Sequence, residues 1–348
     1  MKHPADLLFI GCYTSGDGDG EGIVAARRDT TTGALTPLGL AARTPSPSFL
    51  TRHPGRPLLY AVSERPDGRV NAWRVVEGGR LDPVGGTSTG GSAPCHLAVH
   101  PCGKFVISTN YLSGSVAVNR LADGAPAELT HLVTHTGRGP VADRQDGPHP
   151  HMAAVDPEGF HVHVPDLGAD ALFHYRFDAD AGRLVPTGPT LAWPGSGPRH
   201  VAGRGAFRYV VGELDGTLTC YVRDSRDEAW LVRSRVPLCG DGAPGYPSEV
   251  DVSPDGRFVY AAVRGPDRIC VFATHGGALT RVAEVPCGGE WPRHFTLVDE
   301  HLYVANQYSH TVATLRVDPR TGVPEPTGDV LETPSPSCVL SYFSTRPL

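Results

Sequence analysis

The sequence predicts an all-β fold, a seven-bladed β-propeller with four-stranded antiparallel blades. Three observations support this fold class: a short strand pattern that returns at a regular interval, abundant turn residues, and a segment near the C-terminus that repeats one near the N-terminus. The chain has 348 residues, of which 42 are Gly and 33 are Pro. Because these residues are spread along the chain, they indicate turns between many short strands.

The repeated pattern is an apolar strand that ends in polar residues, followed by a tight turn and another strand. Successive copies begin about 50 residues apart, and this interval, filled with short strands and no convincing amphipathic helix, is typical of a propeller blade. Turns with Pro or Gly precede several copies, and these residue types favour tight hairpins. The predicted strands span residues 9–14, 59–64, 106–111, 162–167, 209–214, 259–264 and 302–307.

The two ends of the chain are predicted to close the ring. Pro45-Ser46-Pro47-Ser48 opens the inner strand of the second blade, and residues 334–337 repeat it near the C-terminus. The N-terminal blade has no inner strand of its own, so residues 338–343 are expected to supply it. Joining both ends in one sheet protects the exposed strand edges. We therefore expect residues 1–348 to form a single propeller domain, closed by N-terminal strands plus a C-terminal inner strand.

Charge and cysteine content argue against several kinds of partner. The formal net charge is −6 and no Lys/Arg cluster stands out, so no nucleic-acid partner is expected. No apolar stretch approaches the ~20 residues of a transmembrane helix, so we expect no membrane partner. The eight Cys contain no C-x-x-C pair, which favours reduced thiols and a cytoplasmic location. Residues 8–12 faintly resemble a lipoprotein cleavage site, but the apolar run before them is far too short.

Polar and ionisable residues recur at equivalent positions in nearly every blade. The inner strand of a blade runs along the central channel and the next strand returns antiparallel, so the start of the first and the end of the second lie at the same mouth. Burying such charges is costly unless they are paired, which indicates a functional site. Solvated strand ends and Arg–Glu salt bridges are the structural alternative. The strand starts carry Ser48, His96, His149 with His151, Arg199 with His200, Ser248 with Glu249, and Arg293 with His294; the strand ends carry Glu64, Asn110, Asp166, Glu213, Arg264, and Asn306 with Gln307.

Motifs around these residues follow one another along nearly the whole chain. They are Arg144-Gln145-Asp146-Gly147-Pro148-His149-Pro150-His151, then the segments 166–170, 195–200, 212–214, 263–265, 292–295 and 305–307. Together, in this order, they resemble the lactonase family of seven-bladed propellers. That family includes propeller-type bacterial 6-phosphogluconolactonases, with fungal carboxymuconate cyclases as relatives. Three positions depart from it: Gly212 and Val263 replace a usual Asn, and Thr109 replaces an expected Ala.

The resemblance implies an active site made of His149 or His151, Arg199, Glu213 and Arg264. Lactone hydrolysis needs a base to activate water, donors for the oxyanion and cations for an anionic substrate. Glu213 or a histidine of the 149/151 pair is the candidate base, and Arg199 the oxyanion or carboxylate partner. Alternatively, Glu213 simply pairs with Arg199 or Arg264 across the channel. The candidates for substrate binding are His200, Arg293, His294, Asn110, Asp166, Gln307 and Arg144.

Arginines at the mouth suit the bidentate recognition of a phosphate, with Arg264 and Arg293 in that role. We expect no metal and no cofactor: other propeller lactonases hold Ca²⁺ through carboxylates and amides, but several arginines would repel a divalent cation here. His161 and His163 are expected to be structural and packed between blades, and His53 and His100 are expected to bond locally in turns.

The expected activity is hydrolysis of a sugar lactone, a small anionic substrate, with 6-phospho-D-glucono-1,5-lactone as the leading candidate. A muconate cycloisomerase of the carboxymuconate cyclase type is the enzymatic alternative. A non-catalytic propeller scaffold is the third interpretation. The absence of Gly-His and Trp-Asp repeat signatures argues against it. The oligomeric state stays open.

Overall fold

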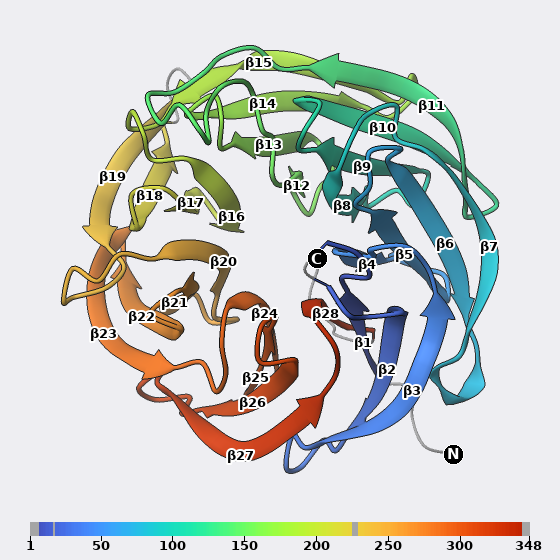
Figure 1. The fold of residues 1–348 in the computed structure, drawn as a ribbon. Coiled ribbons are helices and arrows are strands. Elements are labelled where there is room, and N and C mark those ends of the chain that lie inside the picture. The colour runs from blue at the N-terminus through green and yellow to red at the C-terminus, as the bar shows by residue number, and fades with distance from the viewer. Residues whose placement is uncertain (1–6, 17, 225–228, 343–348) are drawn as a thin grey trace.

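The computed structural model describes residues 7–16, 18–224 and 229–342, which form seven four-stranded antiparallel sheets in a ring around a central channel (Figure 1). Each blade runs outward from an inner strand at the channel to an outer strand at the rim. Among the described residues, the only helical element is a 3-10 turn, Glu77–Gly79. The predicted fold class is confirmed.

Each blade is built from strands that are consecutive in the chain, except that the last strand joins the first three. Blade 1 contains β28 (Pro336–Ser341), β1 (Leu7–Cys12), β2 (Gly22–Arg28) and β3 (Leu35–Arg43). Blade 2 contains β4 (Leu50–Arg52), β5 (Leu58–Ser63), β6 (Arg69–Val75) and β7 (Leu81–Ser88). Blade 3 contains β8 (Pro94–Val99), β9 (Phe105–Asn110), β10 (Ser115–Ala122) and β11 (Ala125–Thr134). Blade 4 contains β12 (Ala154–Val155), β13 (His161–Asp166), β14 (Ala171–Asp178) and β15 (Arg183–Leu191).

The other three blades have the same organisation. Blade 5 contains β16 (Pro198–Arg204), β17 (Phe207–Gly212), β18 (Thr217–Arg223) and β19 (Trp230–Pro237). Blade 6 contains β20 (Tyr246–Val252), β21 (Phe258–Arg264), β22 (Arg268–His275) and β23 (Ala278–Pro286). Blade 7 contains β24 (Pro292–Val298), β25 (His301–Asn306), β26 (Thr311–Val317) and β27 (Pro324–Glu332). The seven strands predicted from the repeat correspond to the second strand of each blade and differ from it by one or two residues at their ends.

The second strand of each blade is rich in apolar residues and buried along most of its length, because both of its faces are covered. Successive side chains of a strand point to opposite faces. In β21, Val259 and Ala261 pack in a core shared with blade 5, whereas Tyr260 and Ala262 pack in a core shared with blade 7. A strand buried on both faces therefore shows a continuous apolar run in place of alternation.

The C-terminal strand closes the ring as predicted. β28 pairs antiparallel with β1, with Phe9 opposite Leu340 and Ile10 opposite Val339. Leu340 packs in a core that includes side chains of blade 2, and Val339 packs in a core that includes side chains of blade 7. Pairing and packing thus join the first and last parts of the chain in one blade. The end of the predicted strand, Phe343, lies outside the described residues.

Two histidines link the turns of neighbouring blades, a role that the sequence analysis underestimated. His53 Nε2 lies 3.1 Å from the carbonyl oxygen of Gly103 in the next blade, and His100 Nε2 lies 2.7 Å from that of Gly159. A Cβ on either glycine would lie 2.7 Å from the facing imidazole, and both have positive φ. Glycine is therefore required on the accepting side of each link.

Five inner strands begin with an irregularity in their pairing with the next strand. The register shifts after Pro94, Pro198, Pro247 and Pro292, and it also shifts where β28 meets the end of β1. Such bulges release a side chain from strict alternation and re-aim it. The residues without a pairing partner are Cys95, Arg199 with His200, Ser248 with Glu249, Arg293 and Ser337.

Candidate active site in the central channel

The bulged strand starts surround a small pocket at one mouth of the channel. Five of the residues that the sequence analysis assigned to a site line it: His151, Arg199, His200, Arg293 and His294. The pocket has room for about one water molecule, 10 Å³ by volume. The other lining residues are Tyr13, Ser48, Phe49, Cys95 and Ser337.

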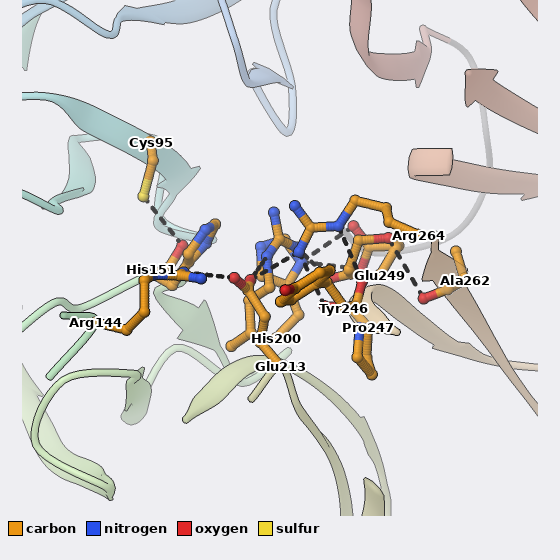
Figure 2. A network of polar contacts seen from close by, with 12 residues as sticks. Cys95, Arg144, His151, His200, Glu213, Tyr246, Pro247, Glu249, Ala262 and Arg264 are labelled. Atoms are coloured by element: carbon orange, nitrogen blue, oxygen red, sulfur yellow. Dashed lines mark hydrogen bonds and ion pairs between the residues drawn. The ribbon is translucent and has the colours of Figure 1, made fainter. Parts of the chain in front are cut away.

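Glu213 is the centre of a cluster of arginines beside this pocket (Figure 2). Arg144 Nη2 donates to Glu213 Oε1 at 2.6 Å. Arg199 Nε and Arg264 Nη2 each lie 2.8 Å from Glu213 Oε2. Burial opposes ionisation of the Glu213 carboxyl, but the three guanidinium groups outweigh it and lower its pKa to about 2. Glu213 is therefore a carboxylate at neutral pH, with the arginine pairing that the sequence analysis gave as its alternative role.

The arginines paired with Glu213 are also held by backbone carbonyls. Arg264 Nε donates to Tyr246 O at 2.9 Å, and its Nη2 lies 3.3 Å from Pro247 O. Arg199 Nη1 donates to the carbonyl oxygen of Ser248. Burial lowers the pKa of Arg264 to about 10, so it remains charged at neutral pH. Two of the three cations are thus fixed in position before any substrate arrives.

Arg293 differs from these arginines in its partners. Its guanidinium lies 4.9 Å from the centre of the Tyr13 ring, and the Tyr13 hydroxyl donates to Glu64 Oε2 at 2.9 Å. Among the described residues, no carboxylate is within ion-pairing distance of Arg293. Arg293 is therefore a cation that lines the pocket with its charge uncompensated by a direct ion pair.

The two histidines of the 149/151 pair have different environments. They precede β12, so they are not part of a regular strand. The His149 ring stacks on Tyr111 at 4.5 Å, its Nδ1 lies 2.9 Å from the Tyr111 carbonyl oxygen, and its Nε2 lies 3.2 Å from Asp146. His151 is buried, lines the pocket, and its Nδ1 has no hydrogen-bond partner. Of the two, His151 is the one with a free ring nitrogen.

Three of the predicted substrate-binding residues are fully or almost fully buried, and none of them lines the pocket. Asp166 accepts from the His149 backbone N–H at 2.7 Å and lies 2.7 Å from His135 Nδ1, so it holds the loop that carries the 149/151 pair. Asn110 donates to Ser115 Oγ at 3.1 Å in a turn. Gln307 has a buried side-chain oxygen without a hydrogen-bond partner.

A second buried network contains a residue that the sequence analysis noted at a strand start but assigned no role. Glu249 lies between His200, at 3.1 Å, and His294, at 3.3 Å. Burial raises the pKa of Glu249 and lowers that of both histidines, to about 4 for His294. The position of Glu249 in the sequence could have indicated this role, since Glu249 occupies the same bulge position in β20 that His200 occupies in β16.

Within the described part of the chain, one group of side chains has the composition and spacing for a metal ion, and it lies away from the pocket. It consists of Cys239, Cys270 and Glu284. Glu284 already pairs with Arg268 at 2.8 Å and Arg281 at 3.2 Å. Two cations on its only carboxylate make this group a poor site for a divalent ion.

A larger hollow, about 260 Å³, lies between the end of β15 in blade 4 and the strands of blade 5. Its walls include Leu191, Trp193 and Tyr221, and Arg235 is the one lining residue that is charged at neutral pH. No acid and base converge there, in contrast to the channel. The channel mouth is therefore the candidate active site.

A closed propeller whose channel mouth holds buried, converging arginines, histidines and carboxylates belongs to the class of propeller enzymes. The chain is a member of the lactonase family of seven-bladed propellers, because residues 7–341 match the family model described as "Lactonase, 7-bladed beta-propeller". Lactonases open cyclic esters with water, and the chain is accordingly a hydrolase of cyclic esters. The described residues contain no helix that is long and apolar enough to cross a membrane.

Relatives that match nearly the whole chain support its membership of this family. The chain is 32% identical to a 6-phosphogluconolactonase of Bacillus subtilis, with 95% of this chain and 97% of the relative covered. It is 29% identical to a 6-phosphogluconolactonase of Formosa agariphila, with 90% and 93% covered. Among solved structures, the periplasmic gluconolactonase of Pseudomonas aeruginosa is similar with a TM-score of 0.89 and 30% identity, covering 96% of this chain and 98% of that one.

Proposed function

We propose that the protein hydrolyses 6-phospho-D-glucono-1,5-lactone to 6-phosphogluconate. The names of the relatives from Bacillus subtilis and Formosa agariphila support this substrate. The observation that carries the proposal is Arg293, a pocket cation with no direct ion pair in the described part of the chain, beside histidines whose ring nitrogens have no partner there. An anionic group of the substrate gives Arg293 a direct ionic partner in addition to the more distant carboxylates of Glu64 and Glu213, which raise its pKa. The planar guanidinium also matches the geometry of a phosphate.

The reaction adds one water to the lactone. The water oxygen bonds to the carbonyl carbon C1, the bond from C1 to the ring oxygen breaks, and the ring oxygen gains a proton. Negative charge develops on the carbonyl oxygen during the attack, and Arg199 is the pocket cation already fixed in position to stabilise it. Glu213 orients Arg199 and Arg264, and its pKa of about 2 makes it a weak proton acceptor at neutral pH.

A cytoplasmic location is part of the same proposal. All eight cysteines are free, and seven of them are buried, which suits a reducing compartment. Fractionation of the native host with an antibody against the chain tests this location.

The experiment compares hydrolysis of freshly generated 6-phosphogluconolactone, corrected for spontaneous opening, by the wild type and by Arg293→Gln. Loss of one charge-assisted contact to the phosphate is expected to raise KM about tenfold or more, with little change for unphosphorylated gluconolactone. The matched control is Arg316→Gln, which breaks an exposed pair with Glu300 and is expected to leave both constants unchanged.

Two further arms test the site. Glu213→Gln leaves its arginines without their carboxylate and is expected to lower kcat/KM by about a hundredfold or more, since donors lose their alignment. A chelator is expected to have no effect. No acceleration by the wild type over spontaneous opening would exclude this substrate. Turnover of a muconate in that case would favour the cycloisomerase alternative.

A further inference from the structure

The Glu249 network fixes the protonation of the histidines around it. The backbone N–H of Val339 donates to His294 Nδ1 at 3.3 Å, so the proton of a neutral His294 is on Nε2, which faces Glu249 at 3.3 Å. The backbone N–H of Val250 donates to Glu249 Oε1 at 3.0 Å. Glu249 thus accepts from two defined donors, as a carboxylate does.

The same carboxylate determines the tautomer of His200. His200 Nδ1 lies 3.2 Å and 3.1 Å from the two oxygens of Glu249. A carboxylate accepts only, so Nδ1 carries the proton and donates, which leaves a lone pair on Nε2. His200 Nε2 is buried and has no hydrogen-bond partner among the described residues. Because buried polar atoms are nearly always hydrogen-bonded, the unpartnered Nε2 in this polar pocket indicates a position where a ligand or a water binds.

The position of His200 suits an attacking water. His200, Arg199 and His151 line the same pocket, which has room for about one water molecule. The His151 and His200 rings lie 5.1 Å apart, edge to face. Figure 2 shows His200, Glu213 and Glu249 in one network of polar contacts, with His151 on the side of Cys95.

We infer that His200 is the general base of the proposed lactonase and that Glu249 is the residue that positions it. The inference deepens the proposed function and depends on it for the reaction. His200 Nε2 accepts a proton from water as the water oxygen bonds to C1. The imidazolium then returns this proton to the ring oxygen as the bond between C1 and that oxygen breaks. Glu249 stays ionised and stabilises the imidazolium, so atoms and charges balance over the cycle.

The other candidate bases lack this combination. Glu213 is held by three arginines, and both ring nitrogens of His149 have partners. His151 has a free Nδ1 but no carboxylate within ion-pairing distance among the described residues, so its protonated form would face Arg199 without a compensating charge. Among these candidate bases of the described channel mouth, only His200 combines a free, buried ring nitrogen with a carboxylate on the opposite nitrogen.

The electrostatics of the channel keep His200 neutral at rest, and the carboxylate of Glu249 balances the charge that the ring gains when it takes up a proton. Burial, followed by the charges of Arg199 and Arg293, lowers the pKa of His200 well below its ordinary value. The other charged or titratable groups near it are Glu249, His96, His151, His294, Glu213 and Arg264.

The first test measures the tautomer without using activity. In ¹⁵N-histidine-labelled wild type, the signals that vanish in His200→Gln are expected to show a protonated Nδ1 and an unprotonated Nε2. In Glu249→Gln, an amide with one oxygen and one NH₂ group replaces the carboxylate. With the NH₂ group directed at His200, Nδ1 becomes the acceptor, so the ring proton of His200 is expected to move to Nε2. A wild-type His200 with its proton on Nε2 would overturn the inference, whatever the activity.

The second test measures turnover of 6-phosphogluconolactone. Glu249→Gln and His200→Gln are each expected to lower kcat by about 10²–10⁴-fold, with KM changed by less than about threefold. Combining them is expected to cost little more than the worse single change, because the two residues act as a unit. The control is His96→Gln, since the buried His96 ring lies 5.7 Å from His200 but does not line the pocket; its kcat is expected to remain near that of the wild type.

Chemical rescue separates a catalytic from a structural role. His200→Ala is expected to regain activity in proportion to added imidazole, whereas His96→Ala is expected to show no response. Full activity of His200→Ala without imidazole would refute the assignment. A wild type that does not hydrolyse the lactone would refute the proposed function instead, and the tautomer measurement would still decide whether Glu249 positions His200.

Discussion

Glu213 and Glu249 show how two glutamates in one channel acquire different chemistry from their neighbours. Glu213 contacts three guanidinium groups, which lower its pKa to about 2. Glu249 has histidines and one backbone N–H around it, and burial raises its pKa. The first is a fixed anion that organises cations, and the second is an anion that shares its hydrogen bonds with titratable rings. Environment, more than residue type, assigns the role.

Buried histidines are expected to make the fold sensitive to mild acid. Burial lowers the pKa of His174 and of His294 to about 4, and it places that of His96, His151, His163 and His200 well below 6.5. An unfolded chain binds protons at these rings near pH 6.5 and the folded chain does not, so the free energy of unfolding falls as pH drops from about 6.5 toward 4.

Urea unfolding at about pH 7.5 and about pH 5 measures this effect, with an expected loss on the order of 2 kcal/mol per buried histidine. Glu249 has the opposite sign, because its raised pKa favours the folded state as acid is added. The contribution of Glu213 is lost only as pH falls from about 4.5 through its pKa of about 2. Equal unfolding midpoints at the two pH values would contradict the expected uptake of protons.

At the scale of elements, the inner strands explain what the sequence predicts well and what it does not. The repeat located the second strand of every blade because this strand is rich in apolar residues and returns at a regular interval. It also located the strand starts at the mouth. Alternation, however, places consecutive residues on opposite faces, whereas Arg199 and His200 both line the pocket. The bulge after Pro198 causes this, and a bulge depends on pairing between strands that a local pattern does not contain.

The loop before β12 illustrates a second limit. The 149/151 pair was expected at the start of a strand, but its conformation depends on Asp166, which accepts from the His149 backbone, and on stacking with Tyr111 from the preceding blade. The partners of Glu249 likewise come from other blades. Residue types at the mouth were thus predictable, but their pairing was not, because it is set by contacts between distant segments.

The contact between His100 and the turn of the next blade predicts that its loss lowers the free energy of unfolding and leaves catalysis unchanged. His100→Ala removes the contact between Nε2 and Gly159 O together with the stacking of its ring on Phe177 at 4.3 Å. A loss of about 1–3 kcal/mol is expected, since a buried acceptor is left without its donor. His100 follows β8 at the end opposite to His96, so kcat and KM are expected to stay unchanged. Urea unfolding and lactone kinetics on the same preparation check both points, and a fall in kcat without a fall in stability would contradict this account.

At the scale of the whole molecule, net charge and local charge have opposite signs. The chain carries a formal charge of −6, which on its own repels an anionic substrate. The pocket nevertheless presents Arg199 and Arg293, and Arg264 lies beside it. A cleft lined by one sign of charge focuses the field, so the approaching anion responds to the mouth more than to the distant surface.

The salt dependence of kcat/KM shows which of the two charges governs the approach of the substrate. If the mouth dominates, kcat/KM for 6-phosphogluconolactone is expected to fall several-fold between about 0.05 M and about 0.5 M NaCl, because screening shortens the reach of the attraction. Unphosphorylated gluconolactone, which is neutral, is the control and is expected to show no trend. In Arg293→Gln the slope for the phosphorylated substrate is expected to flatten. A kcat/KM that rises with salt would mean that the net charge of −6 controls the encounter and that the arginines act only after binding.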